Sequence, residues 1–583
     1  MKLELLKGSR TRILAAVILA IVAIFVVRLF YLQVIKHDFY VALAREEQEN
    51  LFVIPASRGE IYAKSGETPV PMVMNTTVYT VIADPMTVDE KDKVVDTLRK
   101  VAGGNVRTNF DELLDRKESR YQILATKVSR LQAEKIKAEG LHGLRFQEVT
   151  QRVYPEGGLG AQILGFVDME GQGRYGIEDH ENDALKGKDG TLKAVTDISN
   201  IPLTIGNENI RTPKVDGKNI VLSIDRNVQS HTESALATGL QRNGAKKGSV
   251  LVMDPTTGKI LAMANLPTYS PGEYNKVTDV AAFNNDTIST PYEPGSDVKT
   301  FTLAAGIDKN VVRASDTYNN TDAIRVGDIT VTNATKGHTG NITFQTALLY
   351  SLNTGFVTIA QRLGDGTNIT KSARDIMYEY FHNRLGLGTL TGVELANEAK
   401  GTVIAPDDPS GDGNAVRYSN MAFGQGLDAT LIQVAAGFSA LVNGGNYYKP
   451  TVIDGYITEN GFEQNKTPVP LRTNVVTKST SDQVKQATRD ARAVSFGHTD
   501  KAGYYIGGKT GTSQVVINGQ YSDKETVATY LGYGGGSADA PRYVIMVQVS
   551  GEGQKLAGAQ DALPIFTDIS NWMLDYLKIQ PKG

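Results

Sequence analysis

The sequence predicts an α+β protein that consists of a membrane anchor followed by two folded regions. An uninterrupted apolar run stands close to the first residue. In the second half of the chain, strand-like segments come first, a long helical stretch follows, and strands return near the end. Strands at both ends of a helical middle indicate an antiparallel sheet with helices packed on it, rather than alternating βαβ units.

Length and composition agree with a large folded protein. The chain has 583 residues, of which 41% are hydrophobic and 21% charged, and its formal net charge is -3. This length exceeds that of a single small domain. Because Lys+Arg 61 and Asp+Glu 64 nearly balance, the charge offers no basis for binding nucleic acid. The count of Cys 0 excludes disulfides, thiolate metal sites and cysteine nucleophiles, and it is consistent with an oxidising exterior.

The first predicted element is a membrane-spanning helix over residues 13–35. Ile13–Val27 carry no charge, and the apolar character continues past Arg28 to Ile35. About 20 residues at about 1.5 Å each span the ~30 Å hydrocarbon core of a bilayer. Basic residues precede the run, so the positive-inside rule predicts that residues 1–12 are cytoplasmic and that the rest of the chain lies outside. Bulky residues follow the run in place of a small-residue cleavage site, which indicates an uncleaved signal anchor.

Residues 36–219 form the first predicted region outside the membrane, in which short strands alternate with polar helices. We expect strands at Leu51–Pro55 and Val78–Ile82, and helices at Val88–Val101 and Ser129–Glu139. Gly140 supplies a stop signal for the last helix. This region lacks clustered nucleophiles or metal ligands.

Residues 220–583 form the second predicted region, which opens with a strand, a helix and a hairpin. These elements are expected at Ile220–Ile224, at Asn227–Leu240, and at Ser249–Met253 with Lys259–Ala264. The part from Ser296 to Gly445 is expected to be largely helical, with polar loops near Thr317–Thr339 and Thr402–Ser419.

The end of the chain returns to strands and closes with a helix. Strands are expected at Tyr504–Ile506, Gln514–Ile517, Thr526–Tyr530 and Arg542–Val549. The last helix begins at Pro564, and its apolar positions Ile565, Ile569, Trp572, Met573 and Tyr576 recur at helical spacing. This helix is therefore expected to cover one face of the sheet.

Three short motifs in the second region carry candidate chemistry. In the only Ser-x-x-Lys of the chain, Ser296 stands at a predicted helix start and Lys299 one turn later on the same face. A serine hydroxyl is a poor nucleophile until a base takes its proton, and a lysine is such a base once burial or another cation lowers its pKa. The only Ser-x-Asn, Ser351-Leu352-Asn353, and the only Lys-Thr-Gly, Lys509-Thr510-Gly511, follow in that order.

These three motifs in this order are the signature of β-lactamases and penicillin-binding proteins, and the chain resembles a class B penicillin-binding protein. That family comprises membrane-anchored D,D-transpeptidases that cross-link peptidoglycan. Arg58-Gly59-Glu60-Ile61-Tyr62 and Gly176-Ile177-Glu178 resemble its non-catalytic pedestal of the dimerisation type, and Phe423-Gly424-Gln425-Gly426 resembles its catalytic domain. The resemblance implies a pedestal at residues 36–219 and a β-lactamase-like transpeptidase domain at residues 220–583.

The resemblance also implies a role for each motif residue. Ser296 would attack the penultimate D-Ala carbonyl of a stem peptide and release the terminal D-Ala, with Lys299 as the base. Ser351 would relay a proton to the leaving amine, and Asn353 would orient Lys299 and the substrate amide. Lys509 would add a second cation that keeps Lys299 neutral.

The strand that follows Lys509 would bind the substrate. The hydroxyls of Thr510 and Thr512 would bind its carboxylate, beside Gly511, and the backbone N–H groups of Ser296 and Thr512 would form an oxyanion hole. No metal or other cofactor is implied.

The expected ligands are peptidoglycan stem peptides and β-lactam antibiotics. A membrane-embedded glycan polymerase is the partner expected from the family, and the chain would be a single-pass protein of the plasma membrane with its catalytic domain outside. Its overall length and compact pedestal favour the septal type, which acts in cell division, over the elongation type.

Several alternatives compete with this interpretation. Gly503–Thr510 matches the pattern of a nucleotide phosphate-binding loop, but such a loop needs a following helix, whereas a strand is predicted after Gly511. The seven histidines are scattered and form no metal motif. A D,D-carboxypeptidase or β-lactamase on the same fold and a non-enzymatic division scaffold stay open as other functions.

Overall fold

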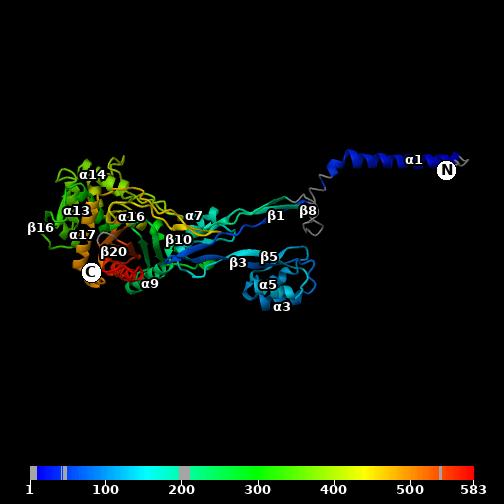
Figure 1. The fold of residues 1–583 in the computed structure, drawn as a ribbon, viewed down its shortest axis with the longest axis horizontal. Helices are drawn as coiled ribbons and strands as arrows, with labels where there is room; N and C mark the ends of the chain where they lie inside the picture. The colour runs from blue at the N-terminus through cyan, green and yellow to red at the C-terminus, as the bar shows by residue number, and fades with distance from the viewer. Residues whose placement is uncertain (1–8, 41–42, 44–48, 196–209, 538–540, 583) are drawn as a thin grey trace. The chain divides into compact units, whose positions relative to one another are not determined.

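The computed structural model describes residues 9–40, 43, 49–195, 210–537 and 541–582 (Figure 1). The chain forms two compact units. One comprises Met1–Arg58 and Lys186–Gly217, and the other comprises Gly59–Leu185 and Lys218–Gly583. Every site described below lies in the second unit.

The first unit contains the apolar helix and a small sheet. Helix α1 (Ser9–Phe30) runs into the π-helix η1 (Tyr31–Ile35), and Arg10–Ile35 are long and apolar enough to cross a membrane. This finding suggests the anchor that the sequence predicts. Strands β1 (Glu49–Ile54), β8 (Gly190–Val195) and β9 (Ile210–Thr212) form an antiparallel sheet in the order β1-β8-β9, which confirms the first predicted strand.

A seven-stranded sheet in the second unit joins distant parts of the sequence. Its strands are β2 (Ile61–Ser65), β3 (Thr68–Ala83), β4 (Gln122–Ser129), β5 (Leu144–Val153), β10 (Asn219–Asp225), β17 (Ile453–Thr458) and β18 (Gly461–Gln464). Their order is β18-β17-β10-β2-β3-β4, and β5 pairs with β3. Strand β10 pairs in parallel with β2 and antiparallel with β17, so strands from both sides of residue 220 share one sheet.

Helices α3 (Lys91–Val101), α4 (Phe110–Leu113) and α5 (Arg130–Ala138) pack on β3 and β4 around a separate small core. Ser129 caps α5 in a capping box with Gln132, which confirms the helix predicted there. The other predicted helix begins at Lys91 instead of Val88, because the N–H groups of Thr87 and Val88 donate to Asp84 in a preceding turn.

The second unit also contains a five-stranded antiparallel sheet. Its strands are β11 (Lys247–Met253), β12 (Ile260–Leu266), β19 (Tyr505–Ile517), β20 (Gln520–Gly535) and β21 (Tyr543–Ser550), in the order β12-β11-β21-β20-β19. Helices α9 (Arg226–Asn243) and α18 (Leu563–Tyr576) pack against one face through a core that includes Val250, Val252, Ile565 and Met573. The final helix therefore covers the sheet as predicted.

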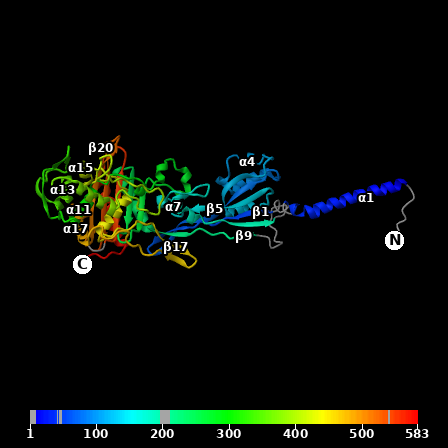
Figure 2. The same cartoon turned by 90° about the horizontal axis from the view of Figure 1, so that it is seen from above.

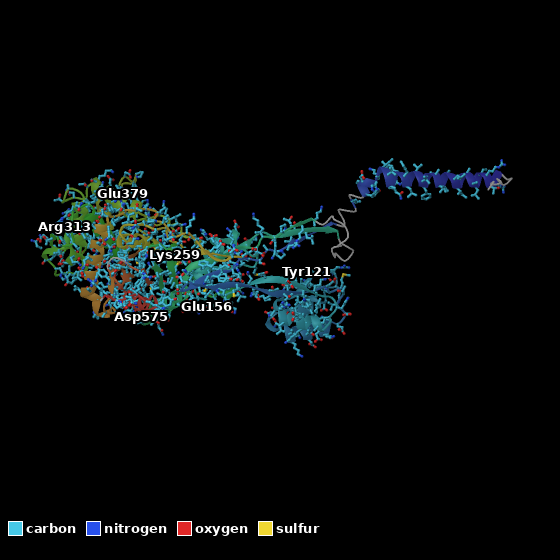
Figure 3. The ribbon with its side chains drawn as sticks, in the orientation of Figure 1. Tyr121, Glu156, Lys259, Arg313, Glu379 and Asp575 are labelled. Atoms are coloured by element: carbon cyan, nitrogen blue, oxygen red, sulfur yellow. The ribbon has the colours of Figure 1, made fainter. Side chains whose placement is uncertain are left out.

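The opposite face of this sheet carries the larger core of the helical lobe. Alternate residues of β11, Leu251 and Met253, point into that core. The lobe contains α11 (Lys299–Asp308), α12 (Phe344–Leu349), α13 (Asn353–Arg362), α14 (Lys371–Tyr378), α15 (Ala415–Met421), α16 (Leu431–Val442) and α17 (Lys478–Phe496). Figure 2 shows α11, α13, α15 and α17 grouped together, and Arg313 and Glu379 mark the lobe in Figure 3.

One expectation about loops was wrong, and another differs at its end. The region Thr317–Thr339 contains hairpins, formed by β13 (Thr317–Asn320) with β16 (Gly340–Thr343) and by β14 (Ala323–Val326) with β15 (Ile329–Thr332). Gly327, with a φ of 58°, supplies the tight turn of the inner hairpin. The second loop ends earlier than expected because the Asn414 side chain caps α15 at the N–H of Arg417.

The two strands predicted on either side of the Lys-Thr-Gly motif are one strand, β19. Two glycines inside this strand, Gly507 and Gly508, are required by packing. A Cβ at these positions would lie 2.5 Å from the Tyr533 hydroxyl and 2.6 Å from the Tyr530 hydroxyl. The tertiary contact with two tyrosines therefore outweighs the low strand propensity of glycine.

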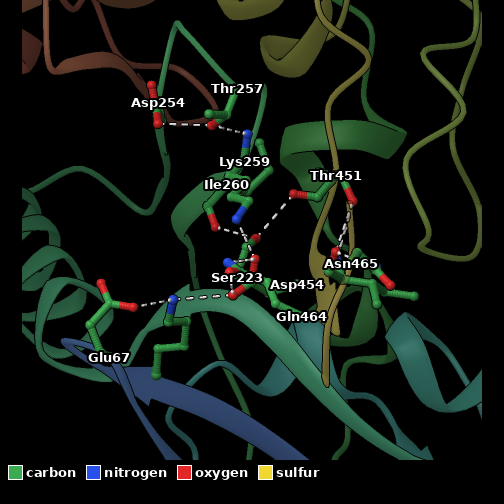
Figure 4. A network of polar contacts seen from close by, with 12 residues as sticks. Glu67, Ser223, Asp254, Thr257, Lys259, Ile260, Thr451, Asp454, Gln464 and Asn465 are labelled. Carbon is green, nitrogen blue, oxygen red and sulfur yellow. Dashed lines mark hydrogen bonds and ion pairs between the residues drawn. The ribbon is translucent and has the colours of Figure 1, made fainter. Parts of the chain in front are cut away.

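A buried polar network connects β2, β12 and β17 (Figure 4). Asp454 on β17 is 1% exposed and pairs with Lys64 of β2 at 3.1 Å and with Lys259, which precedes β12. Gln464 also donates to Asp454 at 3.2 Å. The network thus connects the long β2-β3 hairpin to β12 and β17.

Candidate active site

Ser296 lies in a tight turn just before a helix. It belongs to the 3-10 helix η5 (Gly295–Val298), and α11 begins at Lys299. The sequence placed Ser296 at the start of the helix itself, and the structure inserts this extra turn. Gly295 has a φ of 59°, and a Cβ there would lie 2.9 Å from the Thr512 carbonyl oxygen. Its N–H donates to the Gly424 carbonyl at 2.9 Å, so the turn lies between β19 and the segment that follows α15.

The Lys299 amine is surrounded by oxygen atoms. Its Nζ lies 3.0 Å from Ser296 Oγ, 2.8 Å from the Ser351 carbonyl oxygen and 2.8 Å from Asn353 Oδ1. A backbone carbonyl and an amide oxygen only accept hydrogen bonds. A neutral amine therefore gives its two hydrogens to these acceptors, and its lone pair is free for the Ser296 hydroxyl.

The surroundings of Lys299 favour this neutral form. The side chain is 0% exposed, and burial lowers its pKa well below the ordinary lysine value, with a further lowering from the charge of Lys509. The two effects act in the same direction because each penalises a positive charge at this position.

Ser351 and Asn353 are placed by the junction of α12 and α13. Ser351 adopts a left-handed conformation with a φ of 55°, and its hydroxyl donates to Ser296 Oγ at 2.9 Å. Asn353 is the first residue of α13. Its Nδ2 donates to the Thr332 carbonyl at 2.9 Å, which directs Oδ1 toward Lys299. The structure therefore brings the first two motifs together.

The third motif lies along β19, at the edge of the sheet. Lys509 is buried, and its Nζ donates to the carbonyl and hydroxyl oxygens of Thr510 at 2.9 and 3.2 Å. Gly511 is buried, whereas Thr512 is exposed and its hydroxyl accepts the N–H of Gly558 at 3.1 Å. Because Lys509 lies inside a strand, it lacks the loop and helix that phosphate-binding sites use.

Asp297 is a buried charged residue that the sequence analysis did not single out. It stands between Ser296 and Lys299, and its Oδ2 accepts the Thr529 hydroxyl at 2.7 Å. The signal in the sequence was a carboxylate inside the Ser-x-x-Lys motif. Only the fold reveals that this side chain points inward.

Two family models match the chain. One, described as penicillin binding protein transpeptidase domain, matches residues 248–571, and the other, described as penicillin-binding protein dimerisation domain, matches residues 53–222.

Curated proteins are similar over almost the whole chain. Stage V sporulation protein D of Bacillus subtilis is 28% identical, with 98% of this chain and 87% of that protein covered. A probable peptidoglycan D,D-transpeptidase PenA of Neisseria meningitidis is 26% identical, with coverages of 97% and 93%. Among solved structures, penicillin binding protein 2X of Streptococcus thermophilus shares the fold with a TM-score of 0.72 and 22% identity, over 91% of this chain and 80% of that chain.

Proposed function

The chain belongs to the penicillin-binding protein transpeptidase family, and from this premise we propose that Ser296 carries its reaction through an acyl-enzyme. The protein is a peptidoglycan D,D-transpeptidase of cell-wall synthesis that binds β-lactams. The observation that carries the proposal is the position of the Lys299 Nζ, 3.0 Å from Ser296 Oγ, with the Ser351 carbonyl oxygen and Asn353 Oδ1 beside it as groups that only accept.

Acylation follows from this arrangement. The Lys299 lone pair takes the hydroxyl proton while Ser296 Oγ attacks the penultimate D-Ala carbonyl of the stem peptide. The backbone N–H groups of Ser296 and Thr512 stabilise the resulting oxyanion, each contributing roughly 3 to 4 kcal/mol. A Cβ on Gly295 would lie 2.9 Å from the Thr512 carbonyl oxygen, so the two segments that supply these N–H groups lie close together, which supports this assignment.

Collapse of the oxyanion breaks the peptide bond. Ser351, 3.0 Å from the Lys299 amine, relays the proton to the departing nitrogen, and terminal D-Ala leaves. Asn353 keeps Lys299 oriented, and Lys509 with Thr510 and Thr512 binds the terminal carboxylate beside Gly511. The amine of a second strand then attacks the ester and loses a proton to Lys299. The cross-linking amide forms as the C–O bond to Ser296 breaks, and Lys299 returns the proton to Ser296 Oγ.

Intact-protein mass spectrometry with a labelled penicillin tests the acyl-enzyme. We expect a stable adduct on the wild type and none on Ser296→Ala. Release of the label within minutes would instead assign the chain to the D,D-carboxypeptidase or β-lactamase type. Absence of any adduct on the folded wild type would favour the non-enzymatic scaffold.

We further propose a septal role in cell division, which the names of similar proteins, among them stage V sporulation protein D of Bacillus subtilis, support. Depletion should then give long undivided cells, and a fluorescent fusion should gather at division sites. Rounded or widened cells with lateral fluorescence would assign the protein to elongation.

The same proposal covers topology and domains. Residues 1–12 lie in the cytoplasm, 13–35 span the plasma membrane, 36–219 form the pedestal and 220–583 form the transpeptidase domain. A membrane-embedded glycan polymerase is the proposed partner of the anchor and pedestal. Protease treatment of intact spheroplasts should digest the chain after residue 35, and cross-linking from the exposed anchor side chain of Phe25 should capture that partner.

A further inference from the structure

Asp297 is fully buried beside the nucleophile, yet the steps above do not use it. Its side chain is 0% exposed. Oδ2 accepts the Thr529 hydroxyl at 2.7 Å, while Oδ1 has no hydrogen-bond donor among the residues that the structure describes. A carboxylate with half of its acceptor capacity empty in a protein interior is costly.

The carboxylate lies over Gly511 of β19. A Cβ at position 511 would stand 2.8 Å from Asp297 Oδ2 and 2.1 Å from Thr529 Oγ1, so glycine leaves the space that the Asp297–Thr529 contact occupies. Lys509 and Gly511 are two positions apart and face the same side of the strand, about 7 Å apart along it. Asp297 therefore faces the side of β19 from which the Lys509 side chain projects.

Asp297 and Lys509 influence each other electrostatically. Burial raises the pKa of Asp297, and the Thr529 hydrogen bond and the charge of Lys509 oppose this rise. Burial likewise lowers the pKa of Lys509, and Asp297 opposes that fall. Each group is therefore the charge that stabilises the ionised form of the other in a dry environment.

The other ionisable groups around this pair are neutral, repulsive or engaged elsewhere. Lys299 of α11 and Lys509 repel each other when both are charged. Burial raises the pKa values of Tyr292 and Tyr530, and the charge of Asp297 raises them further. On α17, Lys485 pairs with Asp482, Arg489 stacks on Tyr505 and Arg492 pairs with Asp500. Asp561 of η8 (Gly558–Ala562) accepts the Ala557 N–H.

We propose that Asp297 is a positioning residue for transpeptidation, acting as the internal counter-ion that keeps Lys509 protonated. Through its bond to Thr529 it also fastens the Ser296 turn to β20 across Gly511. The inference rests on the proposed acyl-enzyme function, since it assigns to Asp297 the charge state of the cation that receives the substrate carboxylate.

The inference sets the pH range of acylation. When the pH rises through the pKa of Lys509, the cation is lost and acylation by a carboxylate-bearing substrate falls. This fall is the alkaline limb of the profile of acylation rate against pH. Without the carboxylate of Asp297, Lys509 loses its proton at lower pH, so the alkaline limb moves to lower pH. At pH values where the wild-type carboxyl is itself protonated, the two proteins should converge.

The rate of acylation by a fluorescent penicillin, measured between pH 5 and 10 on the full chain, tests the inference. Asp297→Asn keeps an oxygen that can accept from Thr529 but removes the charge, and we expect its alkaline limb about one pH unit or more below that of the wild type. Glu293→Gln is the matched control. It removes the same charge three residues before the nucleophile, where the charged neighbours are Asp428 and Arg417, and its alkaline limb should stay in place.

A second pair of variants keeps the test decisive if Asp297→Asn does not fold. Thr529→Val removes the hydrogen bond that favours the ionised carboxylate and should move the limb in the same direction by a smaller amount, whereas Thr529→Ser should not move it. An unmoved limb in a folded Asp297→Asn or Thr529→Val protein overturns the inference. A wild type that forms no adduct at any pH overturns the proposed function instead.

Discussion

Lys299 illustrates how burial changes the chemistry of a single residue. A lysine in water is protonated at neutral pH and has no lone pair to offer. In this protein the side chain is 0% exposed and its amine contacts two oxygens that only accept. The same residue type thereby becomes a base.

The contribution of Lys509 to this state is testable through pH. Acylation should rise as the pH increases through the lowered pKa of Lys299, because only the neutral amine accepts the proton. In Lys509→Met the nearby positive charge is gone, so the pKa of Lys299 rises. The increase of acylation with pH should therefore occur at higher pH than in the wild type. Acylation rates against pH give the measurement. Lys485→Met, at a buried lysine that pairs with Asp482 at 2.9 Å, is the control, and an equal shift there would contradict the explanation.

Asn353 should matter through the orientation of Lys299. Asn353→Ala removes the 2.8 Å contact to the lysine amine and leaves the Thr332 carbonyl without its 2.9 Å donor. Because the Lys299 side chain is buried, loss of its Asn353 acceptor costs about 1 to 3 kcal/mol, so the acylation rate constant should fall roughly 5- to 150-fold. Stopped-flow acylation measures it, and the exposed Asn319→Ala should keep the wild-type rate. A normal rate in Asn353→Ala would show that Lys299 is held by its other contacts.

At the scale of elements, the edge strand β19 and the Ser296 turn have to approach closely. The approach depends on glycine at positions 295 and 511, because a Cβ at either would touch the opposite element. The catalytic groups of the two elements are therefore aligned by backbone packing.

Gly511→Ala tests this alignment. The new Cβ would stand 2.1 Å from Thr529 Oγ1 of β20 and 2.8 Å from Asp297 Oδ2 of the turn, so the three elements have to shift apart, at a cost of about 1 to 3 kcal/mol in overpacking. We expect slower acylation by at least about tenfold, if most of that cost falls on the reactive arrangement. Gly497→Ala, where the nearest atom to the new Cβ is 3.8 Å away, is the control for substitution of a glycine. Equal acylation rates in the two variants would show that the alignment does not depend on glycine at position 511.

Some helices and strands were predicted from the sequence, and others were not. The hairpin at Lys247–Leu266, α5 with its capping box and α18 follow from local signals, and all three are present. The hairpins between Thr317 and Thr343 and the unbroken β19 were missed. Short polar strands carry little hydrophobic pattern, and the glycines of β19 are explained by two tyrosines from the neighbouring strand.

At the scale of the second unit, strands from residues before and after position 220 form one sheet. The ion pairs of Asp454 with Lys64 and Lys259 reinforce it. Burial raises the pKa of Asp454, but hydrogen bonds from Lys259, Gln464 and Lys64 outweigh it, so the pKa lies below the ordinary value.

Asp454→Asn should destabilise the protein by about 3 kcal/mol, because two lysines lose the carboxylate between them. A carboxyl with a lowered pKa stabilises the fold above its ordinary pKa of 3.8, and this contribution is lost as the pH falls through the lowered value. The difference in unfolding free energy between wild type and variant should therefore be full at pH 6 and shrink below pH 4. Urea denaturation at several pH values measures it. Asp575→Asn, at an exposed ion pair with Lys501, should have little effect, and a pH-independent difference at Asp454 would contradict the electrostatic account.

The sequence by itself determined the apolar helix, the α+β class, the sheet with its covering helix and the identity of the three motifs. Each of these follows from local patterns of hydrophobicity, turn residues or reactive side chains. Tertiary structure alone decided that Ser296, Lys299, Ser351 and Asn353 meet within hydrogen-bonding distance, that Asp297 lies buried over Gly511, and that β10 and β17 join the sheet of β2 and β3. The physical reason is that burial and charge interactions depend on residues far apart in the chain, and their positions exist only once the chain has packed.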